Sequence, residues 1–253
     1  MDVQYVFDRY KLSGFDKRYI TLNDIEPVLN NLPSHMSLNV AGHSVLNKPI
    51  YTVTIGNGAT RIYIWSQMHG NESTTTRAVM DLINLLSQPG ELSHRLLSHL
   101  TFHIIPMANP DGAEAYTRVN ANGIDLNRDS EQLSQPESKI LREQFEIFNP
   151  HYCYNMHDQR TIFGVGEPPL PATVSFLAPA YNEEREINEP RETSMRLIIA
   201  MARTLRQYIP GQIGRFDDSF NSNCIGDKFQ SLGVPTVLFE AGHFQNDYNR
   251  DNT

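Results

Sequence analysis

Short apolar runs alternate with amphipathic stretches along most of this chain, and this alternation restricts the fold more than any other feature of the sequence. Four runs are apolar or rich in β-branched residues, as buried strands are: residues 61–67, 100–107, 152–156 and 234–239. Apolar residues recur near the helical period in stretches that follow or precede them: residues 74–86, 92–99, 136–148 and about 190–208. Strands that alternate with helices predict an α/β domain.

The first third of the chain adds a hairpin to this pattern. Residues 37–41 and 49–55 alternate well enough for strands, and Gly56-Asn57-Gly58 is a turn signal before the next strand. A hairpin-like opening makes a mixed sheet a better expectation than a purely parallel one. Residues 21–32 are expected to form a capped helix, because Thr21 can cap it and Asp24 follows three residues later.

Composition excludes several classes of protein. The 253 residues are 40% hydrophobic and 20% charged, which is ordinary for a globular protein of one large or two small domains. Acidic residues outnumber basic ones by 29 to 21, which argues against a nucleic-acid binder. No apolar run approaches the roughly 18 residues of a membrane span, and no signal peptide is visible, so we expect a cytoplasmic protein. Cys153 and Cys224 are expected to be reduced thiols.

Candidate metal ligands stand where core strands stop, which is where open α/β sheets bind ligands. His69 follows one strand, Glu72 opens the next helix, and His157 stands at the end of another strand. Two histidines and one carboxylate would leave a tetrahedral zinc with an open position for water, as catalytic zinc sites require. Taken separately, the His69-x-x-Glu72 spacing is weak evidence for a metal, because Glu72 would also serve as a helix cap in a surface loop. His157 alone could likewise be a satisfied histidine at a strand end.

Two further segments carry charged residues without a clear structural reason. Residues 118–128 hold two arginines and several amides with little periodicity. The planar fork of arginine matches carboxylates and polarised carbonyls, but these arginines could equally pair with local acids such as Asp125. Glu240 directly follows an apolar strand, and it is either a cap or a base whose pKa is raised by burial. Asn109-Pro110-Asp111-Gly112, by itself, indicates only a turn.

Taken in order, these segments resemble the M14 family of zinc carboxypeptidases. The resemblance rests on His69-x-x-Glu72, the Asn-Pro-Asp-Gly turn, the run from Arg118 to Arg128, His157 and Glu240. Residues 42–56 are also similar to the family's entry hairpin, so the resemblance covers roughly residues 40–243. Residues 157–163 and 174–179 look like a bacterial branch of the family.

The resemblance implies a fold and a domain organisation. The fold would be α/β, with a mixed, twisted sheet of about eight strands flanked by helices. Residues 1–253 would form a single catalytic domain, with about residues 1–36 as an N-terminal extension packed on it.

The resemblance also implies roles for named residues. His69, Glu72 and His157 would hold one zinc ion, and Glu240 would be the general base for a zinc-activated water. Arg118 would polarise the scissile carbonyl, while Asn127 and Arg128 would bind the terminal carboxylate of the substrate. The partner implied is a peptide or peptide-like substrate with a free carboxylate, without nucleic acid or membrane. The oligomeric state is not assigned.

One departure from the family pattern leaves the substrate open. The family usually has a mobile tyrosine some twenty residues before the catalytic glutamate, but residues 215–224 contain none, and Phe220 is the nearest aromatic residue there. The leading hypothesis is a metallocarboxypeptidase that hydrolyses a C-terminal peptide bond. The alternatives are a zinc amidase acting on murein peptides with γ-D-glutamyl linkages or on N-acyl amino acids, and a binding module without turnover.

Overall fold

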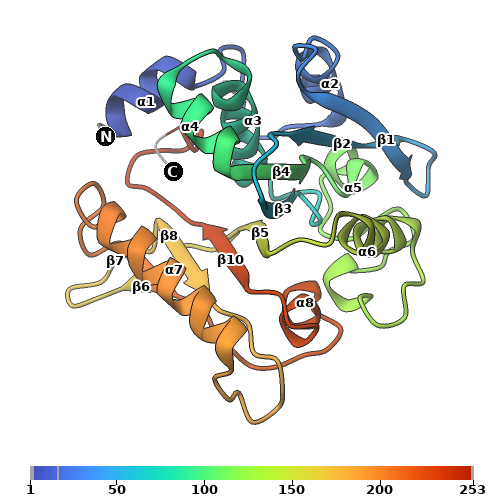
Figure 1. Cartoon of the computed structure of the whole chain (residues 1–253). Coiled ribbons are helices and arrows are strands. Elements are labelled where there is room, and N and C mark those ends of the chain that lie inside the picture. Colours follow the sequence, from blue (N-terminus) through green and yellow to red (C-terminus); the bar gives the residue numbers. More distant parts are fainter. Residues whose placement is uncertain (1–2, 16, 252–253) are drawn as a thin grey trace.

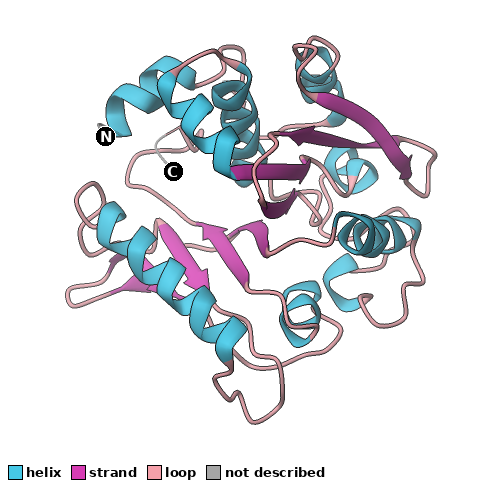
Figure 2. Ribbon diagram, viewed as in Figure 1, coloured by secondary structure: helices cyan, strands magenta, loops and turns pink. Residues whose placement is uncertain are grey.

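The computed structural model describes residues 3–15 and 17–251, which form an α/β domain around an eight-stranded sheet (Figure 1 and Figure 2). The strands lie across the sheet in the order β1-β2-β4-β3-β5-β10-β8-β9. Their bounds are β1 Ser37–His43, β2 Pro49–Ile55, β3 Thr60–Ser66, β4 Leu100–Ile105, β5 Tyr152–Asp158, β8 Val174–Leu177, β9 Ile213–Arg215 and β10 Thr236–Ala241. A separate short hairpin joins β6 Gly164–Val165 to β7 Leu170–Pro171.

The sheet is mixed, with a parallel centre. Strands β4, β3, β5 and β10 are parallel to one another, whereas β1 with β2, β2 with β4 and β8 with β10 pair antiparallel. The predicted α/β class and the mixed sheet of about eight strands are therefore confirmed.

Helices cover both faces of the sheet. Their bounds are α1 Val3–Tyr10, α2 Leu22–Leu29, α3 Thr74–Ser87, α4 Glu91–His99, α5 Pro110–Ala115, α6 Pro136–Phe148, α7 Glu189–Leu205 and α8 Ile225–Ser231, with a short 3₁₀ helix at Leu126–Arg128. Buried side chains of α2 and α3 belong to one hydrophobic cluster, and those of α6 and α8 belong to a second cluster. Helix α7 crosses β8 and β10.

Burial on both faces explains why the central strands read as continuous apolar runs. In β3, Ile62 and Ile64 point into the first cluster, whereas Tyr63 and Trp65 point into the second. All four are buried, as the strands of a parallel sheet with two covered faces must be.

Several predicted elements coincide with the structure. The predicted strand at residues 49–55 is β2, and the predicted helix at residues 136–148 is α6. The N-terminal residues contribute Phe15, Ile20 and Ile25 to the first cluster. The division into a catalytic domain and an N-terminal extension, with its boundary near residue 36, stays a prediction.

Three features of the structure differ from what the sequence predicted. The turn expected at residues 109–112 is the start of α5, because the Asn109 side chain accepts a hydrogen bond from the Gly112 N–H at 2.9 Å and caps the helix. The helix expected at residues 21–32 ends at Leu29. His157 and Glu240, expected at or just after strand ends, are the next-to-last residues of β5 and β10.

Two further expectations concern the cysteines and the membrane. Cys153 and Cys224 are both unpaired, and Cys153 is buried. No helix in residues 3–15 and 17–251 combines the length and the apolar character that crossing a membrane requires.

Phe229 of α8 offers a test of the second cluster. Its side chain is fully buried, stacks on Phe145 at a centroid distance of 4.0 Å and meets the edge of Trp65 at 5.3 Å. We expect Phe229→Ala to lower the free energy of unfolding by about 3–5 kcal/mol, measured by urea denaturation. Leu232→Ala is the control, because Leu232 is 48% exposed and its truncation should cost less than about 0.5 kcal/mol. Equal effects of the two changes would contradict this description of the core.

Candidate metal and substrate site

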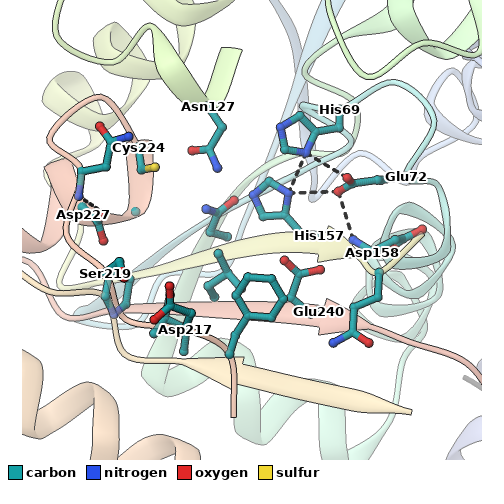
Figure 3. Close-up of a pocket in the computed structure, with 18 of the residues that line it drawn as sticks. His69, Glu72, Asn127, His157, Asp158, Asp217, Ser219, Cys224, Asp227 and Glu240 are labelled. Carbon is teal, nitrogen blue, oxygen red and sulfur yellow. Dashed lines mark hydrogen bonds and ion pairs between the residues drawn. The ribbon is translucent and has the colours of Figure 1, made fainter. Parts of the chain in front are cut away.

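Three predicted metal ligands come together at the carboxyl ends of two adjacent strands. His69 and Glu72 lie in the loop between β3 and α3, and His157 lies on β5, which pairs in parallel with β3. One ligand atom from each residue can be chosen so that all lie within 4.8 Å of one another (Figure 3). Parallel neighbours end at the same edge of a sheet, and this places residues 85 or more positions apart side by side.

The loop that carries His69 and Glu72 is held in a tight turn. The Glu72 N–H donates to the His69 carbonyl oxygen at 3.0 Å. A Cβ atom on Gly70 would lie 1.9 Å from the backbone carbon of Gly112, so only glycine allows α5 to pack this closely. This glycine therefore fixes the position of the two ligands relative to α5.

The distances among the three side chains fit a bound cation. The Glu72 carboxylate oxygens lie 3.0 Å from Nδ1 of His69 and 3.0 Å from Nδ1 of His157. The two Nδ1 atoms lie only 3.1 Å from each other. Two imidazole nitrogens and a carboxylate that point at one place, almost out of contact with solvent, are the donor set that zinc prefers in catalytic sites.

Electrostatics inside this cluster favour a charged carboxylate. Burial alone would raise the pKa of Glu72, but His69 and His157 hold it well below its ordinary value. Burial would likewise lower the pKa of His69, but the carboxylates of Glu72 and Asp125 raise it. For His157, burial prevails over the hydrogen bond to Glu72, and its pKa is lowered. A neutral His157 beside an ionised Glu72 is ready to bind a cation.

Asp125 contacts the candidate metal site, and this contact was not predicted from the sequence. One of its carboxylate oxygens lies 3.0 Å from Nε2 of His69, and the other accepts from Nε of Arg118 at 3.0 Å. Carboxylates behind metal-binding histidines fix the orientation of the ring. The sequence indicated Asp125 only as a partner for nearby arginines, and that pairing is also present.

Asp158 is a second such residue, and it links the metal ligands to helix α3. Its carboxylate accepts from the N–H groups of Thr74 at 2.6 Å and Thr75 at 2.9 Å, while its own N–H donates to Glu72 at 3.1 Å. The signal that could have found it is its place directly after His157, where the strand end meets the first turn of the helix.

All seven predicted site residues line one cavity of about 510 Å³. They are His69, Glu72, Arg118, Asn127, Arg128, His157 and Glu240. Arg118 also donates to Glu72 at 3.2 Å, so its guanidinium is held at the metal site although its side chain is 46% exposed. Arg118 therefore pairs with Asp125 and Glu72 and also faces the cavity, while its role toward a substrate stays a prediction.

Glu240 lies on β10 directly opposite His157 of the neighbouring strand β5. Burial, together with the negative charges of Glu72 and Asp158, raises the pKa of Glu240 to about 8. The predicted rise of this pKa by burial is thus present. A cation bound nearby would favour the ionised form, because bound metal ions reverse the local preference for neutral carboxyl groups.

Asn127 and Arg128 belong to the short 3₁₀ helix on another wall of the cavity. The Asn127 side-chain oxygen accepts from the Ile225 N–H at 3.0 Å, which ties this wall to the start of α8. Nη1 of Arg128 donates to the Asn127 carbonyl oxygen at 2.7 Å and lies 3.0 Å from Sγ of Cys224. The guanidinium is therefore oriented before any substrate arrives.

Phe220 lines the cavity, and no tyrosine is among the described residues that do so. Residues 215–224 therefore contribute Phe220 but no tyrosine hydroxyl to the wall of the cavity. Asp217, Ser219 and Asp227 also face the cavity from this side (Figure 3).

Sequence comparisons place the site in a family context. The family model for zinc carboxypeptidases matches residues 22–161. A probable carboxypeptidase 2 of Arthroderma benhamiae is 27% identical over 124 residues, which cover 49% of this chain and 22% of that protein. A gamma-D-glutamyl-L-diamino acid endopeptidase 1 of Lysinibacillus sphaericus is 35% identical over 99 residues, covering 36% of this chain and 25% of that protein. The chain thus matches about a quarter or less of the length of these curated relatives.

Solved structures share the fold at low sequence identity. A metallo-carboxypeptidase from Burkholderia cenocepacia aligns with a TM-score of 0.70 at 18% identity, covering 89% of this chain and 61% of that one. The murein-tripeptide amidase MpaA from Escherichia coli O157 aligns with a TM-score of 0.53 at 15% identity, covering 88% of this chain and 89% of that one.

Asp125 allows a test of the metal site that leaves all three ligands in place. We expect Asp125→Asn to weaken zinc binding about 10- to 100-fold, because the carboxylate that orients His69 and raises its basicity is lost. Competition with a fluorescent zinc chelator measures the affinity. Glu131→Gln is the control, because Glu131 pairs with Lys228 at the surface and contacts none of the ligands. Unchanged zinc affinity of Asp125→Asn would contradict the orienting role.

Proposed function

The chain belongs to the zinc carboxypeptidase family, and from this premise we propose that it is a zinc-dependent metallopeptidase that hydrolyses the peptide bond before a C-terminal residue. The observation that carries the proposal is the convergence of His69, Glu72 and His157 on one cavity wall, with Glu240 and Arg118 at the same cavity. A ligand set, a base and a cation for the oxyanion are the groups that metal-assisted amide hydrolysis needs.

Zinc held by His69, Glu72 and His157 would supply a Lewis acid and a water whose pKa is lowered to about 7. Glu240 would accept the proton of that water and deliver it to the leaving amine. Its burial at the end of β10 supports this role, because an elevated pKa near neutrality suits a group that must both accept and donate a proton.

Arg118 and Arg128 would each contact one group of the substrate, the scissile carbonyl and the terminal carboxylate. Arg118, held by Asp125 and Glu72, would stabilise the negative charge that develops on the scissile carbonyl oxygen. Arg128 and the amide of Asn127 would bind the terminal carboxylate, for which the guanidinium fork has the matching geometry. The fixed position of Arg128 beside Cys224 supports this, because a preoriented group loses less entropy on binding.

A second candidate activity is hydrolysis of a γ-D-glutamyl linkage in murein peptides. Two observations favour it over other amidase reactions: the 35% identity over 99 residues to a gamma-D-glutamyl-L-diamino acid endopeptidase, and the lack of a tyrosine among the described residues that line the cavity.

Glu240→Gln tests the proposed general base. We expect kcat/KM to fall by about 10²–10⁴-fold, because the amide cannot accept the proton of the attacking water. Zinc content, measured by mass spectrometry of the purified protein, should stay at one ion per chain. Glu143→Gln, an exposed change on α6, is the control for loss of a carboxylate. If Glu240→Gln keeps full activity with zinc bound, Glu240 is not the base.

A pair of isomeric tripeptides separates the two candidate activities. We expect L-Ala-L-Glu-L-Lys with the normal α-linkage to release lysine at least about tenfold faster than L-Ala-γ-D-Glu-L-Lys, because a scissile bond displaced by about 1 Å from the catalytic groups can react about 100-fold more slowly. Lysine release is followed by chromatography with zinc-loaded protein. The reverse preference would support the γ-D-glutamyl activity and contradict the first proposal.

A further inference from the structure

A small recess beside the catalytic cavity gathers three arginines. Arg18, Arg160 and Arg250 line it, together with polar groups at the start of α3. The space is about 10 Å³, which corresponds to one water-sized particle. Asp158 is the one acidic residue among the described residues that line it, so positive charge predominates. None of the roles proposed above uses this recess.

Arg250 is the residue that most needs an explanation. Its side chain comes from the C-terminal segment and is almost completely buried, with 6% exposure. Nη2 donates to the Gln159 carbonyl oxygen at 3.1 Å, but Nε and Nη1 are buried without a hydrogen-bond partner. Buried N–H groups of a charged side chain are costly when unpaired, so an acceptor is expected nearby.

The other two arginines are held in place by uncharged groups. Nη1 of Arg18 donates to the Tyr248 carbonyl oxygen at 2.8 Å, and its guanidinium lies 4.6 Å from the centre of the Tyr248 ring. Nη1 of Arg160 donates to the Asn71 carbonyl oxygen at 2.7 Å, and its guanidinium lies 4.9 Å from the centre of the Tyr116 ring. These contacts orient the guanidinium groups but leave their charge uncompensated.

Asp158 compensates only part of the positive charge of the recess. Its carboxylate oxygens accept hydrogen bonds from the N–H groups of Thr74 and Thr75. Its negative charge, with that of Asp247, favours the charged form of Arg250. Three guanidinium groups line the recess against one carboxylate, so positive charge remains in excess in this small space.

We propose that this recess binds one small anionic group. The occupant is either a free halide ion or a carboxylate that the substrate carries on the amino side of its scissile bond. Arg160 makes the second source possible, because it lines both the recess and the catalytic cavity. The assignment of the site to an anion is independent of the proposed function, whereas the substrate as source rests on it.

The first experiment needs no turnover. Crystals of the zinc-loaded protein are soaked in sodium bromide, and anomalous diffraction locates the bromide ions. We expect a peak between Arg18, Arg160 and Arg250 in the unaltered protein. The peak should be absent in Arg250→Met, which keeps the length of the side chain but removes its charge. Arg95→Met, at an exposed position on α4, is the matched control and should keep the peak.

The second experiment identifies the source with a matched pair of substrates. The two peptides differ only in a carboxylate or a carboxamide on the residue before the scissile bond. If the substrate supplies the anion, kcat/KM should be about tenfold higher for the carboxylate, the effect of one charge-assisted hydrogen bond. Arg160→Gln, a change at an exposed position, should abolish that preference. Bromide should inhibit hydrolysis of the carboxylate peptide but not of the carboxamide peptide.

The outcomes are distinct. A bromide peak with equal hydrolysis of the two peptides identifies a free halide as the occupant. A preference that depends on Arg160 identifies the substrate carboxylate, whether or not bromide binds. A bromide peak in a protein that hydrolyses neither peptide would refute the proposed function and keep the anion site. Absence of the bromide peak together with equal hydrolysis of both peptides overturns the proposal.

Discussion

The parallel pairing of β3, β5 and β10 is the constraint on which the rest of the site depends. These strands end at the same edge of the sheet, and their ends carry or precede His69, His157 and Glu240. Backbone hydrogen bonds between neighbouring strands fix the distance between the strands, so residues of the three segments lie close together although they are far apart in the sequence. A slip of one residue in either pairing would turn His157 or Glu240 to the opposite face of the sheet.

The charged groups at this edge of the sheet are buried, so they lie close to one another with little water between them. Glu72 stays ionised because two imidazoles compensate it, whereas Glu240, without such compensation, has a pKa raised to about 8. Two carboxyl groups in one cavity thus have pKa values that are shifted in opposite directions. Separation of pKa values by environment is the usual way in which one site obtains both a charged ligand and a proton carrier.

Glycine and small polar contacts make this arrangement possible. Gly70 permits the close approach of α5 to the ligand loop, and Asp158 ties the same loop to the first turn of α3. Asp125 belongs to the segment that also carries Asn127 and Arg128, so its carboxylate connects His69 with that wall of the cavity. The recess lined by Arg18, Arg160 and Arg250 adds positive charge on a different side of the same loop.

The sequence by itself determined the class of fold and most of the residues of the site. Buried strands such as residues 49–55 and amphipathic helices such as residues 136–148 are visible locally, because each depends on the period of its own apolar residues. The ordered motifs also named His69, Glu72, His157 and Glu240. Each of these residues has a structural reading when taken alone, and they could be found because the motifs together resemble the M14 family in order and spacing.

Only the tertiary structure decided how those residues are supported and which charges remain uncompensated. Asp125 and Asp158 are ordinary acids in the sequence, and their roles arise from contacts with residues 56 and 84 positions away. The sequence indicated only a turn at residues 109–112 and not the helix at residues 110–115, because the helix cap is a side-chain contact that spacing alone does not reveal. The burial of Arg250 depends on the path of the C-terminal segment across the sheet edge. Local patterns describe what a segment prefers, but burial, pKa and the pairing of distant charges are set by neighbours that only the folded chain supplies.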